Sequence, residues 1–251
     1  MNAVTQSDLI DPSGGDSAEP LRPEIVARAR LYHFFELALA HPAEDGLAYF
    51  RLPSTEADFR RELAALAAPD PALVAGATEA AGRFFAAMRA LADDAAEAAH
   101  IAMFSANYPH LPCPPYGSLF TAPDADKRLA EMLAIKSFYQ RNGVDISDSY
   151  TDLPDHVCVE LEFSQLLCFR ENLAAADPDH QVLDGLRAAQ AEFLDRYLLP
   201  LGKRLAELSA GALPENPYRH LLDSLRDFLI LHRNELAVSV AISNETQENQ
   251  P

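Results

Sequence analysis

The sequence has no tryptophan, only 10 glycines and only 3 cysteines among its 251 residues. So few glycines argue against barrels and sandwiches, which need many tight turns. They also argue against the glycine-rich loops that hold nucleotide phosphates. The cysteines are odd in number and fit no zinc-binding spacing, so we expect neither a disulfide framework nor a bound metal or cofactor.

Long apolar runs are also lacking. None approaches the ~18 residues that a bilayer-spanning helix requires, so we expect no membrane insertion. The opening MNAVTQSDLIDPSGGDSAEP contains no basic residue and no long apolar core, which is unlike a secretory signal. The motifs GxxxxGK[ST], GxGxxG, HExxH and GxSxG are absent as well, so the usual enzyme signatures are missing. We therefore expect a cytoplasmic protein.

Acidic residues dominate the charge. The chain has 38 Asp and Glu residues against 20 Lys and Arg residues, a net charge of −18. This charge would repel nucleic acid and anionic membrane surfaces, whereas a cationic peptide would be attracted. Simple solubility explains the same charge equally well.

The apolar residues repeat with a helical period over most of the chain, and Ala and Leu favour helix over strand. We predict an all-α fold, a single irregular bundle of about eight helices. The expected organisation is a disordered N-terminal arm (1–21), an all-helical domain (22–236) and a flexible C-terminal tail (237–251). The predicted helices are 23–40, one from Thr55, one after Pro71, 94–104, 124–142, 154–173, 180–208 with a kink at Pro200, and 217–235.

Residues 105–123 contain five prolines and cannot form a continuous helix. Their aromatic and aliphatic side chains, Tyr108 among them, argue for an ordered segment that lies over the helices. Within it, CPPYGSLF holds the chain extended and presents Tyr116 and Ser118. This arrangement would suit the recognition of an extended peptide, although a packed crossover is also possible.

The densest polar cluster is LPDHVCVELEF, residues 153–163. Asp155 and His156 lie at the expected start of a helix, where an aspartate caps free amides. Glu160 follows His156 by one turn on the same face. The pair could bind a metal or act as a base, but two ligands are too few for a metal site. A structural interpretation is a cap with a buried His–Glu pair that fixes the helix against the proline-rich segment.

Together these two segments resemble the TorD/DmsD/NarJ family of redox enzyme maturation chaperones. The resemblance runs through AHIAMFSANYPHLPCPPYGSLF, FYQRNGVDISD and LPDHVCVELEFSQLLC. It continues in FLDRYLLPLGKRLAEL and NPYRHLLDSLRDFL, covers about residues 25–232 and is strongest from 99 to 170. Two positions depart from the family pattern. Gly117 stands where an acidic residue is common, and Ser164 and Gln165 replace the usual Met.

The resemblance implies an all-helical chaperone without a catalytic site. Its partner would be the leader or N-terminal region of a molybdopterin-containing oxidoreductase catalytic subunit, and the chaperone would be a monomer or a homodimer. Five residues of this chain match the family's motifs near the proposed leader-binding groove, and we predict that they bind the peptide: Tyr116, Ser118, Asp155, His156 and Glu160.

Two other functions are compatible with the residues. One is a metal- or His-dependent hydrolytic enzyme built on a helical bundle, which stoichiometric metal in the purified protein would support. The other is a helical adaptor without leader specificity, which would enrich no particular molybdoenzyme in a pull-down. The sequence does not name the client.

Overall fold

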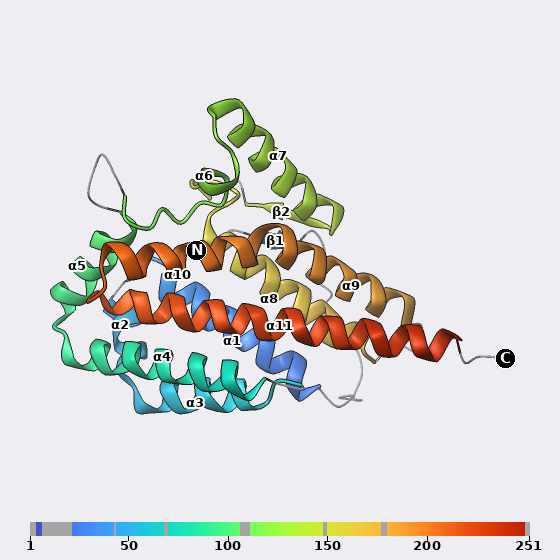
Figure 1. Ribbon diagram of the computed structural model, residues 1–251, viewed down its shortest axis with the longest axis horizontal. Coiled ribbons are helices and arrows are strands. Elements are labelled where there is room, and N and C mark those ends of the chain that lie inside the picture. Colours follow the sequence, from blue (N-terminus) through green and yellow to red (C-terminus); the bar gives the residue numbers. More distant parts are fainter. Residues whose placement is uncertain are drawn as a thin grey trace.

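The fold is almost entirely helical (Figure 1). The structure is a computed structural model that describes residues 4–6, 22–42, 44–67, 70–105, 111–147, 150–176 and 180–248. The predicted all-α fold is confirmed. The described part leaves out most of the predicted arm, including residues 1–3. It also leaves out Tyr108 and the last residues of the predicted tail.

The helices are α1 (Pro23–Leu39), α2 (Glu44–Arg51), α3 (Pro53–Ala64), α4 (Pro71–Ala90), α5 (Asp93–Phe104), α6 (Ser118–Thr121), α7 (Ala125–Arg141), α8 (Val157–Ala174), α9 (His180–Phe193), the π-helix η1 (Leu194–Leu198), α10 (Leu199–Ala212) and α11 (Pro217–Glu248). Two three-residue strands, β1 (Val4–Gln6) and β2 (Val144–Ile146), pair antiparallel.

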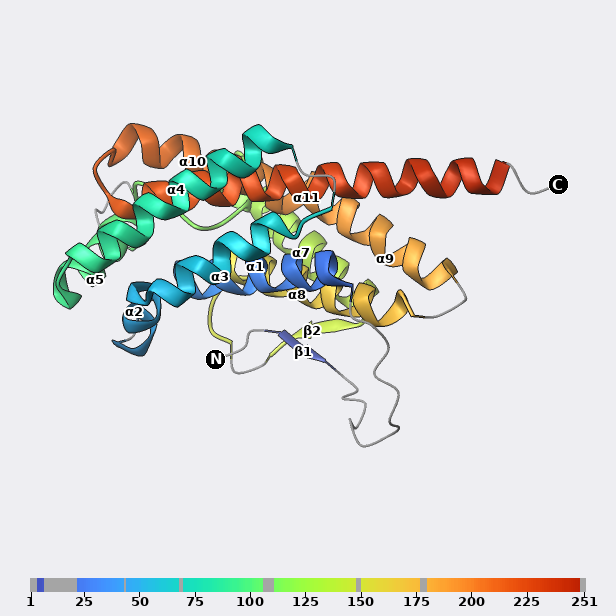
Figure 2. The ribbon, with the colours of Figure 1, turned by 90° about the horizontal axis from the view of Figure 1, so that it is seen from below.

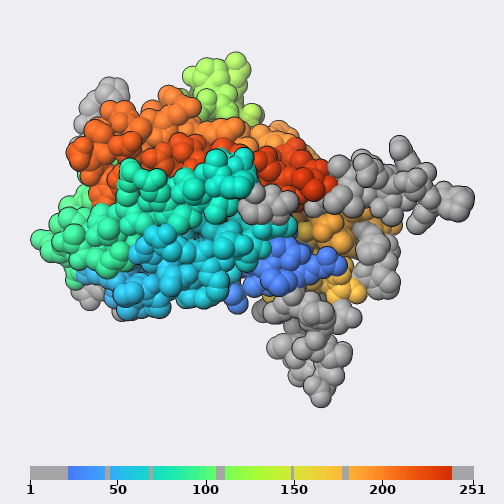
Figure 3. Space-filling model, turned by 60° about the horizontal axis from the view of Figure 1, so that its bottom comes forward, coloured from blue at the N-terminus to red at the C-terminus, as the bar shows by residue number. Residues whose placement is uncertain are grey.

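Two helix pairs form the bundle. Helix α1 packs along α8, and α4 packs along α11, so that the two pairs make two layers (Figure 2). Figure 3 shows α4 against α11 on one face, with the tip of α7 standing above the bundle. Aromatic side chains fill the space between the elements. Phe35 on α1 stacks on Phe228 of α11 with ring centroids 5.5 Å apart, and Phe163 of α8 packs against Phe193 of α9 at 4.8 Å.

Local signals set most helix ends. Proline occupies the first turn of α1, α3 and α4, where its missing N–H leaves no hydrogen bond unmade. Asp70 caps α4 by accepting from the amide of Ala72, and Asp124 caps α7 by accepting from that of Lys127. Gly143, with φ of +67°, ends α7 and leads into β2, because only glycine adopts this backbone easily.

The structure differs from the prediction in several elements. Helix α2 and the β1–β2 pair were not predicted, and β1 falls within the residues assigned to a disordered arm. Helix α3 begins at Pro53 rather than at Thr55, whose hydroxyl donates to the carbonyl of Tyr49. Helix α11 continues through the AVSVAI stretch to Glu248, past the predicted end at Glu235. The division into arm, domain and tail remains a prediction.

Among the described residues, no helix combines the length and the apolar character needed to cross a bilayer.

Candidate functional site

The proline-rich segment is joined to the start of α8 by main-chain hydrogen bonds. The amide of Gly117 donates to the carbonyl of Asp155 at 3.0 Å, and the amide of Val157 donates to that of Pro115 at 2.8 Å. Tyr116 and His156 therefore form an isolated antiparallel β-bridge. The predicted placement of this segment against the helix is thus correct, and the two motifs meet.

Asp155 connects the same two segments through its side chain. Its Oδ2 accepts from the amide of Ser118 at 2.8 Å, and the residue is only 3% exposed. The predicted role of Asp155 as the cap of its own helix is wrong. It caps α6 instead, because Ser118 opens that short helix and offers a free amide.

His156 is the actual cap of α8, since its Nδ1 accepts from the amide of Cys158 at 3.2 Å. This bond places the imidazole proton on Nε2, which lies 3.9 Å from Oδ2 of Asp152. The Tyr116 hydroxyl donates to that oxygen at 3.3 Å, and its ring contacts the imidazole edge-on. Burial lowers the pKa of His156, although Asp152 and Asp155 oppose the shift.

Glu160 is 1% exposed, and its Oε2 has no hydrogen-bond partner among the described residues. Burial, followed by the charge of Asp155, raises the pKa of Glu160 well above its ordinary value. The acidic partner of His156 is Asp152, so the expected His156–Glu160 pair does not form. The Glu160 side chain lies beneath Gly117, where an added Cβ would stand 3.4 Å from Oε1.

Asp155 and Glu160 line a cavity of about 490 Å³, which we call the Glu160 cavity. Three residues of its lining carry a polar atom that is buried without a hydrogen-bond partner among the described residues: Asp155 (Oδ1), Glu160 (Oε2) and Tyr197 (Oη). Buried polar groups are normally paired, so these atoms mark a place suited to a hydrogen-bond donor. The remaining lining residues come from α6 and the turn before it, α7, η1 and α10: Gly117, Ser118, Leu119, Phe120, Thr121, Glu131, Ile135, Arg196, Pro200, Leu201 and Arg204.

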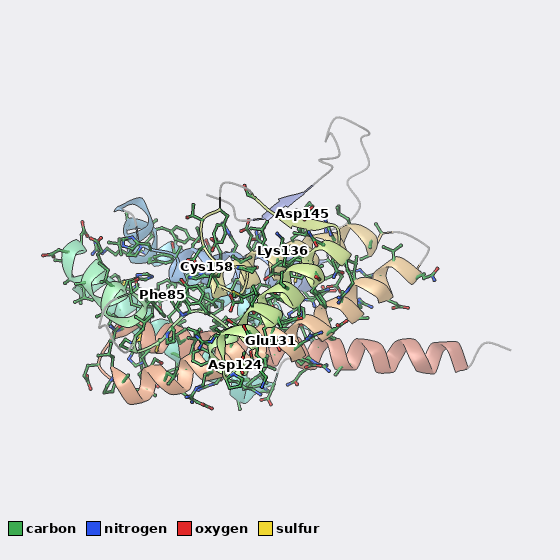
Figure 4. The ribbon with its side chains drawn as sticks, turned by 90° about the horizontal axis from the view of Figure 1, so that it is seen from above. Phe85, Asp124, Glu131, Lys136, Asp145 and Cys158 are labelled. Carbon is green, nitrogen blue, oxygen red and sulfur yellow. The ribbon has the colours of Figure 1, made fainter. Side chains whose placement is uncertain are left out.

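The upper wall of the cavity belongs to α7. Figure 4 shows Asp124, Glu131 and Lys136 following one another along this helix on the top of the bundle. Phe138 and Tyr139, near its C-terminal end, pack against Phe163 of α8. Helix α7 is thus held at one end, and its other half carries Glu131 to the cavity.

Sequence reasoning missed the wall formed by Arg196, Tyr197 and Arg204. A proline inside a helix lacks an N–H and its ring crowds the carbonyl four residues earlier. For Pro200 that residue is Arg196, and the chain widens into η1, where the amide of Leu199 donates to the carbonyl of Leu194. Such single π-turns often occur at functional sites. The predicted kink at Pro200 was therefore the sequence signal that could have indicated this wall.

A second cavity, of about 520 Å³, lies between α1, α3 and α8. Its charged side chains pair with one another: Arg30 with Glu62 at 3.1 Å, and Arg61 with Asp58 at 2.6 Å. The acidic groups there already have cationic partners, which distinguishes them from those of the Glu160 cavity.

Metal binding finds no support in the described residues, where no three His, Cys, Asp or Glu side chains gather as possible ligands. The chemistry that the Glu160 cavity offers is the recognition of a donor or a cation by buried acceptors.

The family profile of the nitrate reductase delta subunit matches residues 67–207, more than half of the chain. The chain belongs to this family. Membership confirms the resemblance to the TorD/DmsD/NarJ chaperones inferred from the motifs.

Two individual proteins are similar to this chain. A selenate reductase assembly chaperone protein from Thauera selenatis is 31% identical over 113 residues, 44% of this chain and 55% of that protein. The match thus spans about half the length of this curated relative. A crystal structure of a candidate redox enzyme maturation protein from Archaeoglobus fulgidus is 21% identical, with coverage of 80% of this chain and 93% of that one and a TM-score of 0.47.

Proposed function

We propose that this chain is a cytoplasmic, non-catalytic assembly chaperone for a molybdopterin-containing oxidoreductase. In this proposal it binds the leader or N-terminal region of the catalytic subunit and holds that subunit until its cofactor has been inserted. Membership of the delta subunit family and the likeness to a selenate reductase assembly chaperone support the proposal.

The observation that carries the proposal is the pair of buried, incompletely bonded carboxylates in the Glu160 cavity. Asp155 Oδ1 and Glu160 Oε2 both lack a partner among the described residues. A twin-arginine leader carries guanidinium groups, which pair with carboxylates more strongly and more specifically than neutral donors do. The net charge of −18 favours the approach of such a peptide.

The five predicted peptide-binding residues have different positions in this proposal. Asp155, Glu160 and Ser118 are among the residues that line the cavity. Tyr116 and His156 lie on the other side of the β-bridge, where their contacts to Asp152 fix the segment that covers Glu160. We therefore assign direct contact to the first group and positioning to Tyr116 and His156.

Co-purification from the native host tests the proposal. The tagged wild-type chain should retain one molybdopterin oxidoreductase catalytic subunit, identified by mass spectrometry. The Asp155→Asn variant should retain at least tenfold less, because a hydrogen bond between charged groups contributes about 1.5 to 3 kcal/mol.

Asparagine keeps an oxygen that can accept from the Ser118 amide, so the helical circular dichroism of Asp155→Asn should match that of the wild type. The variant Glu215→Gln, which removes an exposed carboxylate, is the matched control and should retain the subunit fully. Enrichment of no molybdoenzyme by the wild type, or equal retention by Asp155→Asn, would contradict the proposal.

A further inference from the structure

Helix α7 (Ala125–Arg141) carries two leucines that the fold leaves in solvent. Leu129 is 54% exposed, and Leu133, one turn further along the helix, is 56% exposed. Their neighbours on the same side, Asp126 and Lys136, are exposed as well. At about 100° per residue these four side chains lie within one arc of about 80° around the helix axis. We call this arc the leucine face of α7.

The leucine face points away from the bundle. Ile135, Phe138 and Tyr139, on the other side of α7, are buried, and Glu131, also on that side, lines the Glu160 cavity. The tip of the helix stands above the other elements (Figure 3). A second helix can therefore lie along the leucine face without displacing any part of the bundle or entering the cavity.

The four residues have the spacing of the a and d positions of a heptad, with Asp126 and Leu133 at a, and Leu129 and Lys136 at d. When two such helices pack antiparallel, an a position of one helix lies beside a d position of the other. In the register that joins the leucines, Leu129 of each copy contacts Leu133 of the other. Asp126 then lies opposite Lys136 at both ends of the contact. This reciprocity is the property that a twofold-symmetric interface requires.

The charges of α7 favour the same arrangement. Lys127 pairs with Asp124 in its own chain, whereas Asp126 and Lys136 have no ion-pair partner among the described residues. Helix α7 has four basic and two acidic residues, although the whole chain has a net charge of −18. Two copies of this acidic chain therefore repel each other less where their α7 helices meet than their net charge alone would suggest.

We propose that the leucine face is a homodimer interface, on which α7 of a second copy of this chain packs antiparallel. A single pair of helices buries less than the roughly 1,600 Å² of a standard interface, so the dimer should be weak, with a Kd of about 10 to 100 µM. The inference goes beyond the proposed function and does not depend on it. Because Glu131 lies on the other side of α7, each copy of the dimer keeps its own Glu160 cavity.

Sedimentation velocity of the full chain, from about 1 to about 500 µM, measures the self-association. The wild type should change from monomer to dimer as the concentration rises. Leu129→Ala combined with Leu133→Ala should raise the Kd at least about tenfold, because the apolar centre of the interface is lost. Both leucines are exposed and alanine favours helix, so the helical circular dichroism of this variant should match that of the wild type.

Charge reversal examines the antiparallel register. Asp126→Lys places like charges opposite each other at both ends of the contact, and so does Lys136→Asp. Each variant alone should dimerise about tenfold more weakly than the wild type. An equimolar mixture of the two should regain the dimer, because each copy then offers the charge that the other lacks. Glu215→Lys makes the same charge change at an exposed residue between α10 and α11, so this matched control should dimerise like the wild type.

A wild type that stays monomeric over the whole range would overturn the inference. A dimer that the leucine substitutions leave intact would also overturn it, as would a mixture of the charge variants that is no more dimeric than either variant alone. If the wild type is monomeric and the leucine variant retains less of a molybdoenzyme subunit, the leucine face binds the client instead of a second copy. Co-purification of the subunit reports on the proposed function separately, so the failure of one proposal is distinguishable from the failure of the other.

Discussion

Helix α8 carries two buried glutamates, Glu160 and Glu171, three turns apart and each 1% exposed. Glu171 is surrounded by partners. Its carboxylate accepts from Arg28 at 2.9 Å, from Arg187 at 2.9 Å and from Gln190 at 3.0 Å. Burial alone would raise its pKa, yet these partners prevail and lower it.

Glu160 is equally buried, but no cation among the described residues pairs with its Oε2, and its pKa is raised. The two residues share residue type, helix and degree of burial, so the difference lies in their neighbours. Glu171 has its cations within the chain, as a structural ion pair requires. Glu160 lines a cavity instead, and under the proposed function its cation would come from the client peptide.

The largest expected effect comes from the same substitution at the two positions. Glu171→Gln should lower the free energy of unfolding at neutral pH by about 3 to 5 kcal/mol, because Arg28 and Arg187 lose their buried carboxylate. Glu160→Gln should leave it unchanged or raise it. Urea denaturation followed by circular dichroism measures both. A similar loss in the two variants would mean that Glu160 also has a structural cation.

The contributions of Glu160 and Glu171 to the pH dependence of stability should have opposite signs. The pKa of Glu160 is raised above 4.5, so the folded chain binds this proton more tightly and the free energy of unfolding falls as pH rises above that value. For Glu171 the pKa is lowered from 4.5, and its contribution is lost as pH falls. Glu160→Gln should therefore exceed the wild type in stability by up to about 1.4 kcal/mol per pH unit.

Urea denaturation at a series of pH values above 4.5 measures this difference. The control variant Glu215→Gln, which changes an exposed carboxylate, should follow the wild type at every pH. Parallel curves for Glu160→Gln and the wild type would show that Glu160 titrates normally.

A smaller effect is expected from removing the neighbour of Glu160. Asp155→Ala deletes the acceptor for the Ser118 amide and should cost about 1 kcal/mol, the usual value for a lost helix cap. It also removes a nearby negative charge, so the pKa of Glu160 should fall. The difference between the pKa values of Glu160 and Glu171 should therefore become smaller. Carboxyl carbon NMR shifts of labelled Glu160 measure this pKa. An unchanged value would leave burial as the sole cause.

Much of the fold could be predicted because its signals are local. The helical period, the prolines at Pro23 and Pro71 and the glycine at Gly143 set element ends that depend on few neighbours. The short strands β1 and β2 gave no such signal, because three-residue strands are stabilised by their partner rather than by their own pattern.

The candidate site could be predicted only in part. Residue types and order indicated that the segments of Tyr116 and Asp155 meet. The partner of Asp155, the amide of Ser118, lies 37 residues away in the chain, and no spacing rule connects such positions. Tyr197 lies in the π-turn before Pro200 and lines the cavity. The direction of its side chain depends on a backbone register that the apolar period does not reveal.

The β-bridge between Tyr116 and His156 has a consequence for the tolerance of the chain to insertions. The excursion through α6, α7 and β2 leaves the bundle and returns to it at this bridge. Its two ends are adjacent, so extra residues in the turn around Pro123 would lengthen a surface connection at little entropic cost. Extra residues between Pro115 and Ser118 would instead break the bridge. Insertions and deletions among relatives should therefore occur in the turn around Pro123 and be absent between Pro115 and Ser118.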